Sequence, residues 1–261
     1  MLIYEIKKNI LSEQIKKNII PLFIWPIIEI IHIIYNYNFS LGIHVTKIFS
    51  LSKNNLFIFV VSTYLLFSIF DKYVENSWRI NFEKYQGVIS QFFISPYPRY
   101  KWLLNRSIAS FVSSSLPYSI IYIGFVCFTD GLDYTTKINL LFILILSIII
   151  SIFWGAFLIS IFLLFRDGSP LLMIFTSLQY MVSGVQVPFK FMPKTISFMI
   201  NIFPLSFLSS VTYNLLSMKL FLFKNMVIQS CIFSATLILI TPITIKIVEK
   251  ILKNTGNFDL F

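Results

Sequence analysis

Long apolar runs alternate with short polar stretches along the whole chain. A run of about 20 apolar residues can cross the hydrocarbon layer of a membrane as one helix. Six runs reach or approach this length, at residues 19–36, 55–71, 105–128, 138–165, 171–187 and 226–246. Lipid offers no hydrogen-bond partner to a free backbone group, and the alternating pattern of a membrane barrel is absent. The pattern therefore predicts an all-α membrane protein with six transmembrane helices in a single domain, residues 1–261.

The composition supports this class. Of the 261 residues, 57% are hydrophobic and only 12% are charged, whereas about 25% are charged in a typical soluble domain. The net charge of +10 would suggest a nucleic-acid partner in a soluble protein. Here the lysines lie in loops and tails, where they set the topology and meet anionic lipid headgroups. We expect membrane lipids as partners, and no nucleic acid.

The distribution of Lys and Arg predicts the orientation. With the N-terminus in the cytoplasm, the cytoplasmic segments carry fourteen of these residues and the outer segments carry seven. Positive residues are enriched on the cytoplasmic side, so both termini are expected there. No cleavable signal peptide is evident, because Pro21, Pro26 and Glu29 interrupt the first apolar run and no small-residue cleavage site follows it.

Residues 1–18 precede the first span. Leu2, Ile3, Ile6, Ile10 and Ile15 recur there at near-helical spacing among four lysines. This pattern is typical of an amphipathic helix that lies in the membrane interface.

The second and third spans are joined by a cytoplasmic loop, residues 72–104, that contains an amphipathic stretch. Tyr85, Val88, Ile89, Phe92 and Phe93 follow helical spacing, so one helix with a single apolar face is expected. Proline at positions 96 and 98 should end this helix at position 95 and let the next begin near position 99. The helix could rest on lipid or dock into the groove of a cytoplasmic partner, and the pattern alone leaves both open.

Two motifs resemble a known family. The first is Glu83 and Gly87 followed by "SPYPR" at Ser95–Arg99, and the second is "SGVQVPFKFMP" at Ser183–Pro193 followed by "NIFPLSFL" at Asn201–Leu208. Nearly the whole chain resembles the membrane subunits, or permeases, of type-2 ABC exporters for drugs, polysaccharides and lipids. The resemblance is in the order and spacing of the two motifs and in the number of spans. This chain departs from the family at Val88 and Ile89, where a threonine and an acidic residue are usual.

The resemblance implies roles for particular residues and partners. The loop would be a coupling helix that contacts a separate ATP-binding cassette ATPase, through Glu83, Tyr85, Gly87, Val88, Phe92, Phe93, Pro96 and Arg99. An outer loop, residues 188–224, would hold short re-entrant helices before the sixth span and an outer gate with Pro188, Phe191, Pro193 and Pro204. A second copy of the chain, or a related permease, would complete the pathway in a bacterial plasma membrane. For Pro188–Pro204, anchoring by aromatic side chains at the headgroups is the alternative.

The chain itself offers no nucleotide site or catalytic motif. None of its eight glycines is followed by lysine, so the phosphate-binding loop is missing. The zinc pattern HExxH and the nucleophile motif GxSxG are also missing. We therefore expect a transport subunit, not an enzyme, with ATP and Mg²⁺ bound by the partner ATPase and no cofactor bound here. The expected cargo is an amphipathic or hydrophobic molecule that leaves the cell.

Several polar residues interrupt the apolar runs. Glu29 lies near the middle of the first span with His32 on the same helical face, and Gln179, Ser183 and Gln186 share a face of the fifth span. Because a charged residue at the bilayer centre costs about 2.5–3.5 kcal/mol, Glu29 must face protein or water. These residues could line a translocation path or make structural contacts between helices. The alternative function is a proton-coupled secondary transporter, or a substrate-binding membrane component, that uses Glu29 and His32.

Small residues in the spans have simpler explanations. Gly155 and Ala156 are expected to form a close-packing notch. Cys127 and Cys231 are expected to be buried, free thiols.

Overall fold

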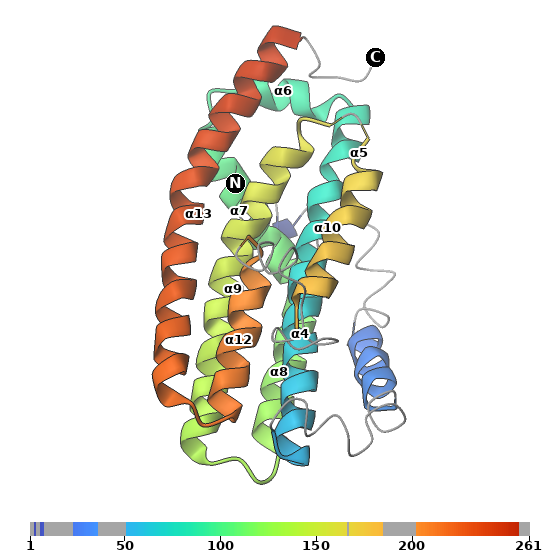
Figure 1. Ribbon diagram of the computed structural model, residues 1–261. Helices are drawn as coiled ribbons and strands as arrows, with labels where there is room; N and C mark the ends of the chain where they lie inside the picture. Colours follow the sequence, from blue (N-terminus) through green and yellow to red (C-terminus); the bar gives the residue numbers. More distant parts are fainter. Residues whose placement is uncertain are drawn as a thin grey trace.

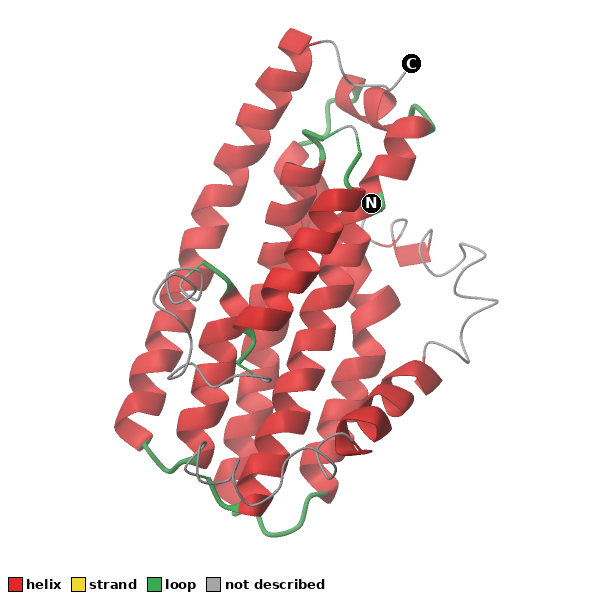
Figure 2. Cartoon of the chain, turned by 45° about the vertical axis from the view of Figure 1, so that its right-hand side comes forward, coloured by secondary structure: helices red, strands yellow, loops and turns green. Residues whose placement is uncertain are grey.

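The computed structural model describes residues 3, 6, 7, 23–35, 51–165, 167–184 and 202–255. Regular structure within this part of the chain is entirely helical, and the long helices lie side by side in one bundle (Figures 1 and 2). After an apolar helix at Phe23–Tyr35 come α4 (Lys53–Trp78), α5 (Ile80–Tyr85), α6 (Val88–Ile94), α7 (Arg99–Ser110), the π-helical turn η1 (Phe111–Ser115), α8 (Leu116–Phe128), α9 (Tyr134–Phe162), α10 (Ser169–Val182), α12 (Pro204–Leu216) and α13 (Leu220–Thr255). The interfacial helix predicted at residues 1–18 lies almost wholly outside the described residues.

Four of the described helical segments are long and apolar enough to cross a membrane. They are Lys53–Tyr85, Arg99–Phe128, Tyr134–Phe162 and Phe221–Asn254. This confirms the prediction of an all-helical protein with several membrane-crossing helices. Two apolar helices, Phe23–Tyr35 and α10, lie where the first and fifth spans are predicted but are shorter. The 14 residues of α10 extend about 21 Å, less than the thickness of the hydrocarbon layer of about 30 Å.

Local signals delimit α10. At its start, the Asp167 carboxylate accepts a hydrogen bond of 2.9 Å from the backbone N–H of Ser169, and this bond lowers the pKa of the Asp167 carboxyl. At its end, Gly184 has a φ of +73°, a left-handed conformation that terminates many helices. The helix therefore stops before the end of the apolar run that predicts a span over residues 171–187.

The centre of the bundle is α4, which packs against α8, α9, α10 and α12. Its side chains Phe59, Phe70 and Tyr73 are among the largest fully buried ones in the described residues. Gly155 on α9 faces this helix, and a Cβ atom built there would overlap the Tyr73 ring and lie 2.8 Å from the Ser107 hydroxyl. Gly155 thus forms the close-packing notch that the sequence predicts.

The region predicted as an outer loop contains a packed helix. Ten of the thirteen residues of α12 are buried, and the helix packs against α4, α9 and α13. It begins about midway along the bundle and ends near the start of α13, at the end of the bundle opposite α6 (Figure 1). A short turn with Met218 at a φ of +58° joins the two helices. Residues 204–216 therefore belong to the bundle.

The prediction for the two cysteines is confirmed for their free thiols but not for their burial. Both thiols are free, as expected, but Cys127 and Cys231 are exposed, so the predicted burial was wrong. Their helices turn these faces outward, where an apolar thiol can face lipid.

Candidate functional site

The segment between α4 and α7 forms one end of the bundle, where α6 lies across the long helices (Figure 1). The sequence predicts a single helix here, but the structure divides it into α5 and α6. The break is at Gln86 and Gly87, and Gly87 has a φ of +66°, which glycine adopts without steric cost. The predicted end before Pro96 and the new start at Arg99 are both confirmed.

Because of this break, the predicted apolar face is divided. Ile89 and Phe93 turn inward and are buried. Tyr85 and Val88 remain partly exposed, and Ile94 is 84% exposed. Phe82, which the spacing did not select, is also exposed, whereas the side chain of Phe92 lies outside the described residues. The apolar side chains at this end of the bundle therefore come from both short helices.

Glu83 contacts α7 and is not a free surface carboxylate. Its Oε2 accepts a hydrogen bond of 2.5 Å from Nη1 of Arg106. Both side chains are mostly buried, and the Arg106 guanidinium lies 5.7 Å from the centre of the Trp102 ring. Removing one partner of an ion pair shielded in this way leaves an uncompensated buried charge, which costs more than breaking an exposed pair.

Arg99 organises the turn around Pro96. Its guanidinium donates hydrogen bonds to the carbonyl oxygens of Phe93 (2.6 Å), Ser95 (2.8 Å) and Tyr97 (2.9 Å). It also pairs with Glu249 near the C-terminal end of α13, at 3.9 Å. The planar guanidinium suits this use because it directs several donors at once. Arg99 therefore satisfies carbonyls at the end of α6 and links that end to α13.

Lys84 is a third anchor, which the sequence analysis did not select. Its side chain is buried, and its Nζ donates to the carbonyl oxygens of Leu163 and, at 3.0 Å, Phe165. These carbonyls follow the C-terminal end of α9, where a cation also complements the helix dipole. Nothing in the sequence distinguishes Lys84 from the other lysines, because its partners are backbone atoms about 80 positions away.

Together, these contacts tie α5, α6 and the following turn to three long helices. Glu83 contacts α7, Lys84 contacts the end of α9, and Arg99 contacts α13. The side chains of α5 therefore reach α7 and α9, and the turn after α6 is connected to α13.

A polar contact joins the Phe23–Tyr35 helix to α4. The hydroxyl of Ser68 donates to Glu29 at 3.4 Å, and the indole N–H of Trp25 donates to the other carboxylate oxygen. Glu29 is half-buried and contacts both helices, in agreement with the prediction that it faces protein or water. His32 lies on the same helix with an exposed side chain.

The predicted polar face of the fifth span is described only in part. Ser183 is buried and donates to the carbonyl of Tyr180 at 2.7 Å. Gln179 is fully buried, and within the described residues neither its amide oxygen nor its amide nitrogen has a hydrogen-bond partner. A buried polar group without a partner costs about 1–3 kcal/mol, which makes Gln179 a candidate for binding a ligand. Pro204 is buried at the start of α12, whereas Gln186, Pro188, Phe191 and Pro193 lie outside the described residues.

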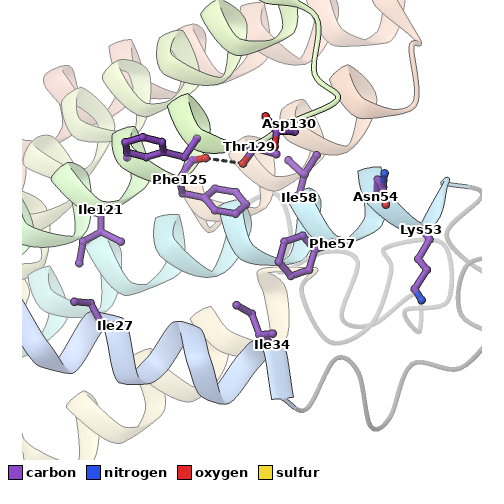
Figure 3. A pocket seen from close by; sticks show the side chains of 12 residues that line it. Ile27, Ile34, Lys53, Asn54, Phe57, Ile58, Ile121, Phe125, Thr129 and Asp130 are labelled. Atoms are coloured by element: carbon purple, nitrogen blue, oxygen red, sulfur yellow. Dashed lines mark hydrogen bonds between the residues drawn. The ribbon is translucent and has the colours of Figure 1, made fainter.

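A groove lies at the opposite end of the bundle from α6, between the Phe23–Tyr35 helix, the start of α4 and the end of α8 (Figure 3). Its volume is about 850 Å³, and it is open on one side. Isoleucine and phenylalanine side chains form most of its walls, and polar side chains lie at the helix ends. Sequence reasoning missed this groove because its walls come from three separate segments of the chain.

The chain was also compared with known proteins. No family model matches it, and neither the curated proteins nor the solved structures gave a match. The functional conclusion therefore depends on the residues and geometry described above.

Proposed function

We propose that this chain is the membrane subunit of an ATP-driven exporter and that α5 and α6 form its contact with a separate ATPase. The observation that carries the proposal is the anchored end of the bundle. There, two short helices expose apolar side chains while buried polar contacts tie them to α7, α9 and α13. Exposed apolar side chains beside a polar rim are typical of surfaces that bind other proteins.

In the proposed mechanism, these contacts transmit a movement of the ATPase to the long helices of the bundle. ATP and Mg²⁺ bind to the partner ATPase, and its closure displaces α5 and α6 together. Arg99 transmits this displacement to α13, while Glu83 and Lys84 transmit it to α7 and α9. Two copies of the chain enclose the pathway, and each uses Phe23–Tyr35 and α10 as parts of a first and a fifth span. An amphipathic or hydrophobic cargo then leaves the cell.

The arrangement of the ends supports the proposed orientation. The C-terminal end of α13 lies at the same end of the bundle as α6 (Figure 1). That part of α13 carries Lys246, Lys250 and Lys253. A cluster of lysines favours the cytoplasmic side, where an ATPase would dock.

The docking surface can be tested with Ile94→Asp, which places a charge on the most exposed of the apolar side chains described in α6. Tyr134→Asp is the matched control, because Tyr134 is 78% exposed at the opposite end of the bundle, in the first turn of α9. The variants are co-expressed with the ATP-binding cassette ATPase that the proposal requires. Co-purification of the two proteins and cargo-stimulated ATP hydrolysis are then measured.

We expect Ile94→Asp to abolish co-purification and stimulation, because a carboxylate buried in an apolar contact loses its hydration. The control should retain both. Full co-purification and stimulation by the Ile94→Asp variant, inserted normally in the membrane, would refute the docking role.

The contact between Glu29 and Ser68 motivates a second candidate, a proton-coupled transporter. A half-buried carboxylate between helices can carry a proton across a membrane. This candidate predicts transport into vesicles without nucleotide, driven by a proton gradient and lost in Glu29→Gln. The exporter requires ATP on the side of α6, and a proton gradient alone drives no transport.

A further inference from the structure

The groove has an apolar interior. Phe57 of α4 and Phe125 of α8 contact each other in its floor, with an edge-on geometry and ring centres 6.2 Å apart. Ile27 and Ile34 on one side and Ile121 on another point into the same space (Figure 3). Walls of this kind offer few hydrogen bonds, so they favour an aliphatic occupant over a polar one.

Gly124 keeps the interior open. It lines the groove, and a Cβ atom built on it would have no other atom within 4 Å. The volume of about 850 Å³ lies within the usual range for ligand sites, roughly 300–1,000 Å³. One fatty acyl chain can therefore lie along the groove beside Phe125.

The mouth of the groove carries charges of both signs. Lys53 and Asn54 open α4, and Thr129 and Asp130 follow the end of α8. Helix ends of membrane-crossing helices lie where lipid headgroups begin. The lysine ammonium complements a phosphate, and the Asp130 carboxylate complements an ammonium group. A headgroup with both charges matches this mouth better than a purely anionic one.

We propose that this groove binds a zwitterionic membrane phospholipid of the phosphatidylethanolamine type. One acyl chain lies against Phe57, Ile121 and Phe125, and the headgroup lies between Lys53 and Asp130. The site requires neither the ATPase nor a particular cargo, so it can be tested independently of the proposed function.

The test uses the full-length chain in nanodiscs that contain phosphatidylethanolamine and phosphatidylglycerol. In separate samples, one of the two lipids carries a photoreactive diazirine in its acyl chain. After illumination, adducts are located by mass spectrometry of peptides. We expect adducts of the phosphatidylethanolamine probe to concentrate on Phe57, Ile121 and Phe125, and to exceed those of the phosphatidylglycerol probe.

Three variants separate specific binding from ordinary lipid contact. Gly124→Leu fills the groove and should remove most groove adducts, whereas Gly124→Ala, the matched control, should retain them. Adducts on Ile232 and Ile243, exposed on α13, should stay unchanged and report normal folding and lipid contact. Asp130→Asn should reduce the preference for phosphatidylethanolamine while leaving adducts of phosphatidylglycerol in place.

Groove labelling no stronger than labelling of α13, or unaffected by Gly124→Leu, would show ordinary surrounding lipid and overturn the proposal. Equal labelling by the two probes would overturn the assignment of the headgroup. Neither result would bear on co-purification with the ATPase, so failure of this site and failure of the exporter function are distinguishable.

Discussion

At the scale of single residues, the polar side chains of this apolar chain are explained by their partners. Glu29 meets Ser68 between two helices, and Lys84 meets the carbonyls beyond α9. Gln179 and Asn81 are exceptions within the described part of the chain, because both amide atoms of each side chain are buried without a hydrogen-bond partner there. The sequence predicted that Glu29 must face protein or water, because a charge in lipid is costly. It could not predict the partner of Lys84, which depends on how two distant segments pack.

Gly155 gives a prediction about stability. In Gly155→Ala, the new methyl group would overlap the buried Tyr73 ring, which has no free space to enter. We expect the free energy of unfolding to fall by about 1–3 kcal/mol, the usual cost of overpacking. Denaturant titration of the purified protein in detergent measures this change.

Gly124→Ala is the control for this prediction, because a Cβ at Gly124 meets no other atom. Alanine also favours the helical state over glycine, so its stability should be unchanged or slightly higher. Equal stability of the two variants would contradict the close contact between α4 and α9.

At the scale of elements, the prolines predicted the helix ends more accurately than the spacing of apolar residues did. Pro96 and Pro98 predicted where α6 ends and where α7 begins, because proline constrains its own backbone and that of the preceding residue. The spacing of apolar residues predicted one face across Gly87, but the structure breaks the helix there. A glycine is compatible with a helix, and contacts of Glu83 and Lys84 with distant helices accompany the break.

The turn anchored by Arg99 carries the second prediction. Arg99→Ala removes three hydrogen bonds to carbonyls and the ion pair with Glu249. If this turn transmits motion to α13, the variant should still bind the ATPase but lose most cargo-stimulated ATP hydrolysis. Arg99→Lys should restore little, because an ammonium group cannot reproduce the planar set of donors.

The matched control is Lys253→Ala. Lys253 also pairs with Glu249, at 2.8 Å, but its side chain is 61% exposed, and such pairs contribute about 0–1 kcal/mol. We expect normal stimulation in this variant. Equal loss in both variants would assign the effect to Glu249 alone, and normal stimulation in Arg99→Ala would exclude the turn as a transmitting element.

At the scale of the whole molecule, the apolar runs predicted where most helices lie but not their lengths. The run at 55–71 belongs to a helical segment that extends to Tyr85, and the run at 171–187 yields the 14-residue α10. Helix caps, glycines and packing determine where these helices end. Hydropathy is an average over many residues, so it does not locate the ends. The groove between the Phe23–Tyr35 helix, α4 and α8 also depends on packing, so no run of sequence could predict it.

The orientation of the bundle decides between the functional proposals, and it yields the last prediction. In a chain whose two cysteines are replaced by serine, one cysteine is introduced at Gln91 on α6 or at Tyr134 at the opposite end, both exposed positions. Intact cells are treated with a maleimide that cannot cross the membrane. The excess of Lys and Arg at the end near α6 predicts labelling at position 134 in intact cells and at position 91 only after lysis. The reverse pattern would place α6 outside the cell, where no ATP-hydrolysing partner could reach it.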